Sequence, residues 1–108
     1  MDERRLLRIA KALADPRRLA ILEAITRAGE ITCGQLAALF PVGQSTVSHH
    51  VGILERADLV HVHRKGQHAI FSPRPETLAA YVEALKAKLF VSPPQRPDEG
   101  AEREGGQP

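Results

Sequence analysis

Residues 29–66 read GEITCGQLAALFPVGQSTVSHHVGILERADLVHVHRKG. This pattern predicts a short helix, a tight turn, a second helix rich in hydroxyl and imidazole side chains, and then a hairpin with a basic tip. A helix surface of Ser, Thr, Gln and His beside a basic β-ribbon suits the edge of a DNA groove better than an enzyme pocket. The stretch therefore favours a nucleic-acid partner over catalytic chemistry.

Cap and turn residues define the first half of this stretch. Thr32 can cap a helix over residues 33–39, in which Leu36 and Leu39 are expected to face inward. The Pro-Val-Gly sequence at 41–43 then makes a turn. Together these signals predict the first helix and the turn of a helix-turn-helix.

The second half of the stretch contains the other helix and the hairpin. The helix is predicted from about Gln44 to Ala57. Two strands follow at 60–64 and 68–72, and the Lys-Gly-Gln sequence at 65–67 joins them as a glycine-containing hairpin turn.

Three further helices are predicted around this stretch. The first covers residues 3–13, and the second begins with Asp15 as N-cap and Pro16 at its first position, ending at about Ala28 before Gly29. The last runs from residue 75 or 76 to about 90, and its apolar stripe consists of Leu78, Val82, Leu85 and Leu89. The order of elements is that of a winged helix-turn-helix, mainly α with a small β-hairpin, in one domain over residues 1–91.

Charge and composition set the limits of this interpretation. The formal net charge is +2, and residues 92–108 hold two arginines against four carboxylates, so residues 1–91 carry +4. A mildly basic domain suits a polyanion, although a solvated surface explains the charge equally well. Residues 92–108 are rich in Pro, Gly and charge, which predicts a disordered tail.

The single cysteine, Cys33, points to a reducing compartment, because it allows no disulfide within one chain. No signal peptide or membrane-spanning run is visible, so we expect a cytoplasmic protein without a membrane partner. No nucleophile–base pair, phosphate loop or paired carboxylates suggest an enzyme.

The helix over 44–57 is the predicted reading head. On a helical wheel Val47, Val51 and Leu54 share the core side, and polar residues lie opposite. His50 falls between the two faces and is expected to pack against a neighbouring helix. The predicted DNA contacts on this helix are Gln44, Ser45, Thr46, Ser48, His49 and Arg56.

The hairpin supplies the other predicted DNA contacts, which are Arg64, Lys65 and Gln67 at its tip. Long cations on a protruding ribbon can lie along phosphates or in a minor groove. Charges at a hairpin can equally serve only to discourage edge pairing. The nearby histidines His61, His63 and His68 leave open a metal site or a pH response, although no acidic residue or cysteine is fixed beside them by spacing.

These residues resemble the ArsR/SmtB family of bacterial winged-helix repressors over roughly residues 6–89. The resemblance is carried by KALADPRRLAIL at 11–22, QSTVSHHVGIL at 44–54 and HRKGQHAIF at 63–71. It implies a homodimer that binds a palindromic operator and represses transcription. The interface it implies lies on the first and last helices, at Leu6, Leu7, Leu78, Val82, Leu85 and Leu89.

The resemblance does not extend to the metal sites of the family's sensors. Where those proteins carry two ligands at the start of the third helix, this chain has Thr32 and Gly34, with Cys33 between them. The last helix contains no histidine. We therefore predict no metal and no cofactor. Cys33 is expected to be a small buried hydrophobe, since the sulfur-reactive members use two cysteines.

Two residues depart from the family pattern and leave alternatives open. Gly52 stands where lysine is common, and Asp58 stands where glycine usually ends the helix. These departures bear on affinity and operator sequence. The regulator can be constitutive or respond to an unknown effector. A winged-helix module that binds another protein, or a metal-responsive regulator that uses the hairpin histidines, is the alternative.

Overall fold

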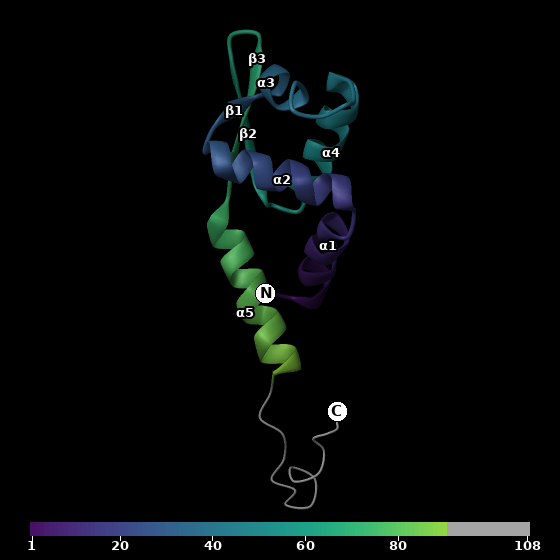
Figure 1. Cartoon of the computed structure of the whole chain (residues 1–108). Coiled ribbons are helices and arrows are strands. Elements are labelled where there is room, and N and C mark those ends of the chain that lie inside the picture. The colour runs from purple at the N-terminus through teal and green to yellow at the C-terminus, as the bar shows by residue number, and fades with distance from the viewer. Residues whose placement is uncertain (91–108) are drawn as a thin grey trace, which may run out of the picture.

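Five helices and a three-stranded antiparallel sheet make up residues 1–90, the part of the chain that this computed structural model describes (Figure 1). The elements in chain order are α1 (Glu3–Leu13), α2 (Pro16–Ala28), β1 (Ile31–Thr32), α3 (Cys33–Ala37), α4 (Gln44–Arg56), β2 (Val60–Lys65), β3 (His68–Pro73) and α5 (Pro75–Leu89). The predicted winged helix-turn-helix is confirmed. The tail predicted over residues 92–108 lies outside the described residues.

Polar side chains fix where α2 and α3 begin. The Asp15 carboxylate accepts the backbone N–H groups of Arg17 and Arg18 at 2.8 and 3.1 Å. Thr32 and Gln35 form a reciprocal capping box, in which each side chain accepts the other residue's backbone N–H at 3.1 and 3.0 Å. Caps of this kind stabilise a helix by about 1 kcal/mol each. The caps predicted at residues 15 and 32 are therefore present.

The wing is the hairpin of β2 and β3. Lys65 lies opposite His68 at its tip, and Gly66 takes a positive φ of 64° in the turn between them. Each strand is one residue longer than predicted. The connection therefore shortens to Gly66 and Gln67, and glycine accommodates the left-handed conformation that such a turn needs.

A third strand, β1, was not predicted. Ile31 pairs with Phe71 and Thr32 pairs with Ile70, so the sheet order is β1-β3-β2. Two residues are too few to display an alternating pattern, and they become a strand only because β3 lies beside them. The strand ties the start of α3 to the base of the wing.

The core forms where α2, α3 and α4 pack together and against the sheet. Its fully buried side chains include Ile9, Ile21, Ile25, Leu36, Val47, Leu54, Leu59 and Val60. The inward position predicted for Leu39 is wrong, because this residue is 61% exposed. The chain tightens after α3, where Leu39 N–H bonds to the Leu36 carbonyl at 3.0 Å. That turn points Leu39 outward, and Phe40 packs against the core in its place.

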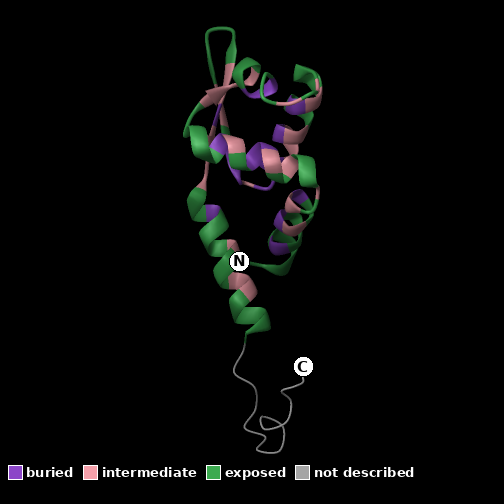
Figure 2. Ribbon diagram, in the orientation of Figure 1, coloured by how far each residue is buried: buried purple, intermediate pink, exposed green. Residues whose placement is uncertain are grey.

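Helix α5 extends away from this core and, with α1, forms the opposite end of the molecule from the wing tip (Figure 1). Thr77 is its only buried residue (Figure 2). Most of its apolar stripe therefore faces outward. Across residues 1–90 no helix is both long enough and apolar enough to cross a membrane.

Candidate nucleic-acid interface

Helix α4 has one buried face and one exposed polar face, as predicted. Val47, Val51 and Leu54 are almost completely buried. The opposite face carries the exposed side chains of Gln44, Ser45, Ser48, His49 and Arg56, whereas Thr46 is half-buried. Because the apolar face anchors the helix to the core, the polar face is held outward in a fixed orientation. These hydroxyl, amide and imidazole groups can donate to and accept from base edges.

The N-terminal end of α4 has no side-chain cap. Gly43 is its N-cap residue, and no side chain hydrogen-bonds to the first backbone N–H groups of the helix. The Gln44 amide lies back over α3, where its Nε2 would be 3.6 Å from a Cβ at Gly34. The first turn of α4 therefore keeps unpaired N–H donors and the positive end of the helix dipole, both of which attract phosphate.

His50 belongs to the scaffold, as the wheel predicted. Its Nδ1 accepts a hydrogen bond from Arg18 Nη1 of α2 at 3.4 Å. Burial lowers the pKa of the His50 imidazole, which favours the neutral ring that can accept this bond, while the nearby Asp15 carboxylate opposes the shift. The neighbouring His49 is exposed. Two consecutive histidines thus have different positions, one against α2 and one on the polar face.

The wing tip presents Arg64, Lys65 and Gln67, and all three are exposed. Neither cation has a carboxylate within ion-pair distance among residues 1–90. Their charge is therefore not neutralised by the described part of the protein. Cations placed this way at the end of a ribbon can contact phosphates or enter a minor groove.

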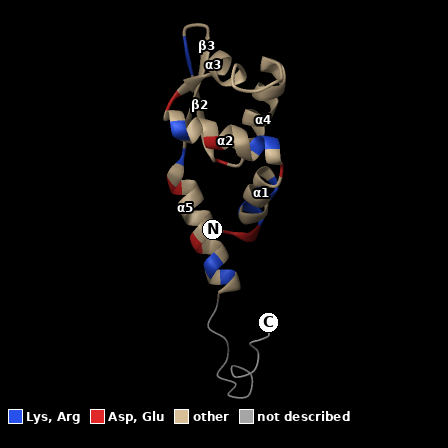
Figure 3. Cartoon of the chain, in the orientation of Figure 1, with Lys and Arg blue, Asp and Glu red and all other residues tan. Residues whose placement is uncertain are grey.

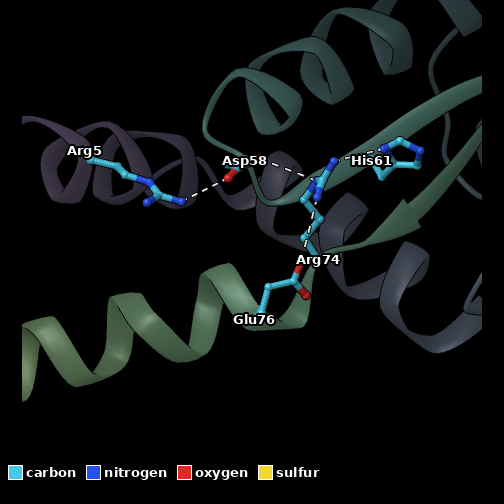
Figure 4. Close-up of polar contacts among 5 residues, drawn as sticks. All are labelled: Arg5, Asp58, His61, Arg74 and Glu76. Carbon is cyan, nitrogen blue, oxygen red and sulfur yellow. Dashed lines mark hydrogen bonds and ion pairs between the residues drawn. The ribbon is translucent and has the colours of Figure 1, made fainter. Parts of the chain in front are cut away.

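A polar network that the sequence did not reveal joins α4 to α1 and α5 (Figure 4). Asp58 takes a positive φ of 67°, a conformation that Asp tolerates better than most residues other than glycine. Its carboxylate contacts Arg5 of α1 at 3.0 Å and Arg74, just before α5, at 3.5 Å. Arg74 also donates to His61 Nδ1 at 3.1 Å and lies 3.8 Å from Glu76. Asp58 therefore performs the turn expected of glycine and adds contacts that glycine cannot make.

Comparisons with known proteins agree with this geometry. The family described as a helix-turn-helix domain matches residues 13–63. Transcriptional repressor SdpR of Bacillus subtilis is 38% identical over 64 residues, which are 59% of this chain and 70% of that protein. The biofilm growth-associated repressor of Agrobacterium fabrum is 31% identical over 85 residues, 79% of this chain and 71% of that protein.

A solved structure extends the likeness to the whole fold. The crystal structure of an ArsR family transcriptional regulator superposes with a TM-score of 0.74 at 28% identity, covering 87% of this chain and 98% of that one. The chain belongs to the ArsR/SmtB family. It is a DNA-binding regulator of transcription, of the repressor type, built on the winged helix-turn-helix.

At one pair of ligand positions of the ArsR/SmtB metal sensors, this member has Thr32 and Gly34. The Thr32 hydroxyl accepts the Gln35 N–H as the cap of α3, and Gly34 has no side chain. In the wing, the rings of His61 and His63 stack with centroids 5.5 Å apart, and His63 Nε2 lies 3.6 Å from Glu30. No group of three His, Cys, Asp or Glu side chains within residues 1–90 is arranged to hold a metal.

Cys33 lies half-buried against the core of this ArsR/SmtB protein. Burial raises the pKa of its thiol, and the charge of Arg64 opposes that shift. The protonated thiol is the less nucleophilic form. Cys33 is therefore less buried than the small buried hydrophobe predicted from the sequence.

The side chains predicted for an ArsR/SmtB dimer interface have unequal exposure. Leu6 is only 6% exposed and packs inside the protomer, and Leu85 is half-buried. The exposed members of the set are Leu7, Leu78, Val82 and Leu89, and Phe90, which is 77% exposed, lies beside Val82 and Leu89. Four of the six predicted interface side chains are therefore exposed, one on α1 and three on α5, whereas Leu6 is buried within the protomer.

Proposed function

We propose that two copies of this chain bind one palindromic operator and place their α4 helices in successive major grooves. The exposed face of α4 carries this proposal, because Ser45, Ser48 and His49 project from a helix whose other face is buried. The wing-tip cations Arg64 and Lys65 then contact the backbone or minor groove beyond each half-site. This arrangement divides base reading from phosphate binding. A cytoplasmic location belongs to the same proposal.

The second copy is proposed from the apolar surface of α5. Val82, Leu85, Leu89 and Phe90, with the stem of Lys86, line a hollow of about 340 Å³. Exposed apolar area of this kind costs free energy in water, at roughly 25 cal/mol per Å². A symmetric partner that presents the same surface would cover it. Dimerisation through α5 also fixes the spacing of the two α4 helices.

Selection of duplex DNA from a random pool by the purified protein, at near-physiological salt, tests the proposal. We expect enrichment of a palindrome whose half-sites are about one helical turn apart. Enrichment of a single half-site would contradict the dimeric arrangement. Weak binding that disappears with salt and selects no sequence would contradict operator recognition and favour a module that binds another protein.

A further inference from the structure

The cations of residues 1–90 form two groups. One group lies within ion-pair distance of carboxylates and consists of Arg5, Arg27, Arg74, Lys86 and Lys88. The other has no such partner within the described residues and consists of Arg4, Arg8, Lys11, Arg17, Arg18, Arg56, Arg64 and Lys65. Basic residues on α1 and at the start of α2 lie on the same side of the molecule as α4 (Figure 3). Cations without a carboxylate partner within residues 1–90 are therefore found on α1 and α2 as well as on the wing and α4.

Four of these unpaired cations surround one hollow. Arg8 and Lys11 of α1, Arg18 of α2 and Arg56 of α4 line a space of about 270 Å³, together with Ala12 and Ile53. We call this the α1–α4 hollow. Four like charges around one small space repel one another in the free protein, and the attraction of an anion between them would offset that repulsion.

Arg18 is held in place by the protein before any ligand arrives. Its Nε donates to the Ala12 carbonyl at 2.9 Å, and its Nη2 donates to the Lys11 carbonyl at 3.3 Å. The contact of Nη1 with His50 fixes the third side of the guanidinium group. An arginine immobilised in this way loses little conformational entropy when it binds an anion.

The α1–α4 hollow lies at the C-terminal end of α4, and this position indicates which part of the DNA would reach it. The distance from Gln44 to Arg56 along the axis is about 18 Å at 1.5 Å per residue. The major groove is about 12 Å wide, so a helix of this length that lies across the groove reaches the sugar-phosphate backbone with its last turns. The free carbonyls of a helix C-terminus repel phosphate. The four cations make the electrostatic potential positive at the place where the DNA backbone would pass.

We propose that the α1–α4 hollow binds a phosphate of the operator backbone, in addition to the contacts of the polar face of α4 and the wing. The proposal rests on operator binding as the proposed function. Because the hollow lies on the α1 side of α4, away from the wing tip, the phosphate belongs to the DNA between the two half-sites. Arg8, Lys11 and Arg18 thereby join the DNA-contacting residues.

The salt dependence of DNA binding by the full chain tests this proposal. Arg8→Gln and Lys11→Gln each remove one charge from an exposed side chain, and Arg27→Gln is the matched control because Arg27 pairs with Glu23 at 2.7 Å. The slope of log affinity against log salt should fall by about 1 to 2 per dimer for each hollow variant. Affinity for the selected operator and for unrelated duplex should fall about equally, roughly tenfold at low salt.

Hydroxyl-radical footprinting supplies a positional readout. Arg8→Gln should lose protection between the half-sites, whereas the wing variant Arg64→Ala should lose it at the outer flanks. If the wild-type protein binds the operator but both hollow variants keep the slope and footprint of Arg27→Gln, the phosphate site is refuted and operator binding stands. If the wild-type protein selects no duplex, operator binding itself fails. Thermal unfolding and sedimentation of each variant establish that fold and assembly are retained.

Discussion

The wing tip and the region around α5 both carry Arg and Lys side chains, but these cations have different surroundings. Near α5, Arg74 lies between Asp58 and Glu76, so its charge holds protein segments together. At the wing tip, Arg64 and Lys65 have no carboxylate partner among the described residues. The net charge of +2 conceals this division. The placement of carboxylates, more than the number of cations, indicates which surface is available to a polyanion.

Apolar residues show the reverse contrast. Helix α4 buries Val47, Val51 and Leu54 inside the protomer and leaves its polar face outside. Helix α5 leaves Val82 and Leu89 outside. Helix α4 therefore buries its apolar face within one copy, whereas the exposed apolar face of α5 is the surface on which we propose that a second copy binds. The following variants separate these two roles.

The largest effect is expected from Val82→Glu on α5. A carboxylate in the proposed interface cannot be buried without a partner, so the dimer should dissociate. Each monomer then holds one half-site, and operator affinity should fall by about 100-fold or more, since each 1.4 kcal/mol corresponds to a factor of ten. Sedimentation and operator titration measure both effects. Leu19→Glu changes an exposed leucine on α2 and should leave the dimer intact; an unchanged assembly for Val82→Glu would remove α5 from the interface.

The adjacent histidines of α4 provide a matched pair of smaller effect. His49→Ala should change the preferred base at one position of each half-site by about 1–3 kcal/mol and leave stability unchanged. His50→Ala should instead reduce stability by about 1 kcal/mol, because it removes the acceptor for Arg18. Repeated DNA selection and urea unfolding distinguish them. An altered operator preference for His50→Ala alone would reverse the two assignments.

Substitutions of Asp58 test the polar contacts that connect the end of α4 with α1 and α5. Asp58→Ala removes both arginine contacts. It also places alanine, which tolerates the left-handed conformation less well than Asp does, at a φ of 67°. We expect a loss of about 1–2 kcal/mol in the free energy of unfolding. Asp58→Gly relieves the backbone strain and should recover at least half of it. Equal losses in urea unfolding would show that the ion pairs, and not the backbone, dominate.

The smallest effect is expected from Gly52→Ala on the exposed side of α4. Alanine should raise stability by about 0.5–1 kcal/mol, because glycine is a poor helix former. A Cβ there meets only Arg56 Nη1 at 3.6 Å, an ordinary contact. Operator affinity should stay within about twofold in the same titration. A large loss of affinity would mean that DNA approaches this backbone more closely than the proposed arrangement allows.

Sequence patterns predicted the features that depend on neighbouring residues. The periodicity of Val47, Val51 and Leu54, the cap at Asp15 and the glycine of the hairpin turn all act within a few positions, and the structure has each of them. The exposed polar face of α4 followed from the same periodicity.

Features that depend on distant pairing were not predictable. Arg5 and Asp58 are 53 positions apart, so their ion pair appears only when α1 lies beside the end of α4. Strand β1 exists only through its pairing with β3, which lies far along the chain. The division of cations into paired and unpaired groups is of this kind. It needs the fold in part, because three of the six Lys or Arg ion pairs within residues 1–90 join residues that are far apart in the chain: Arg5–Asp58, Arg74–Asp58 and Lys88–Glu3.

Because no side chain caps α4 at Gly43, DNA binding would also stabilise the first turn of this helix. Asp15 and Thr32 cap the first turns of α2 and α3, whereas no side chain within residues 1–90 caps the first turn of α4. An operator phosphate seated on these N–H groups would take the place of the absent side chain. The phosphate would then complete the hydrogen bonding of the first turn of α4. Part of the free energy of DNA binding would therefore be free energy of helix formation. Any sequence change that caps α4 internally would stiffen the free protein while weakening its hold on DNA.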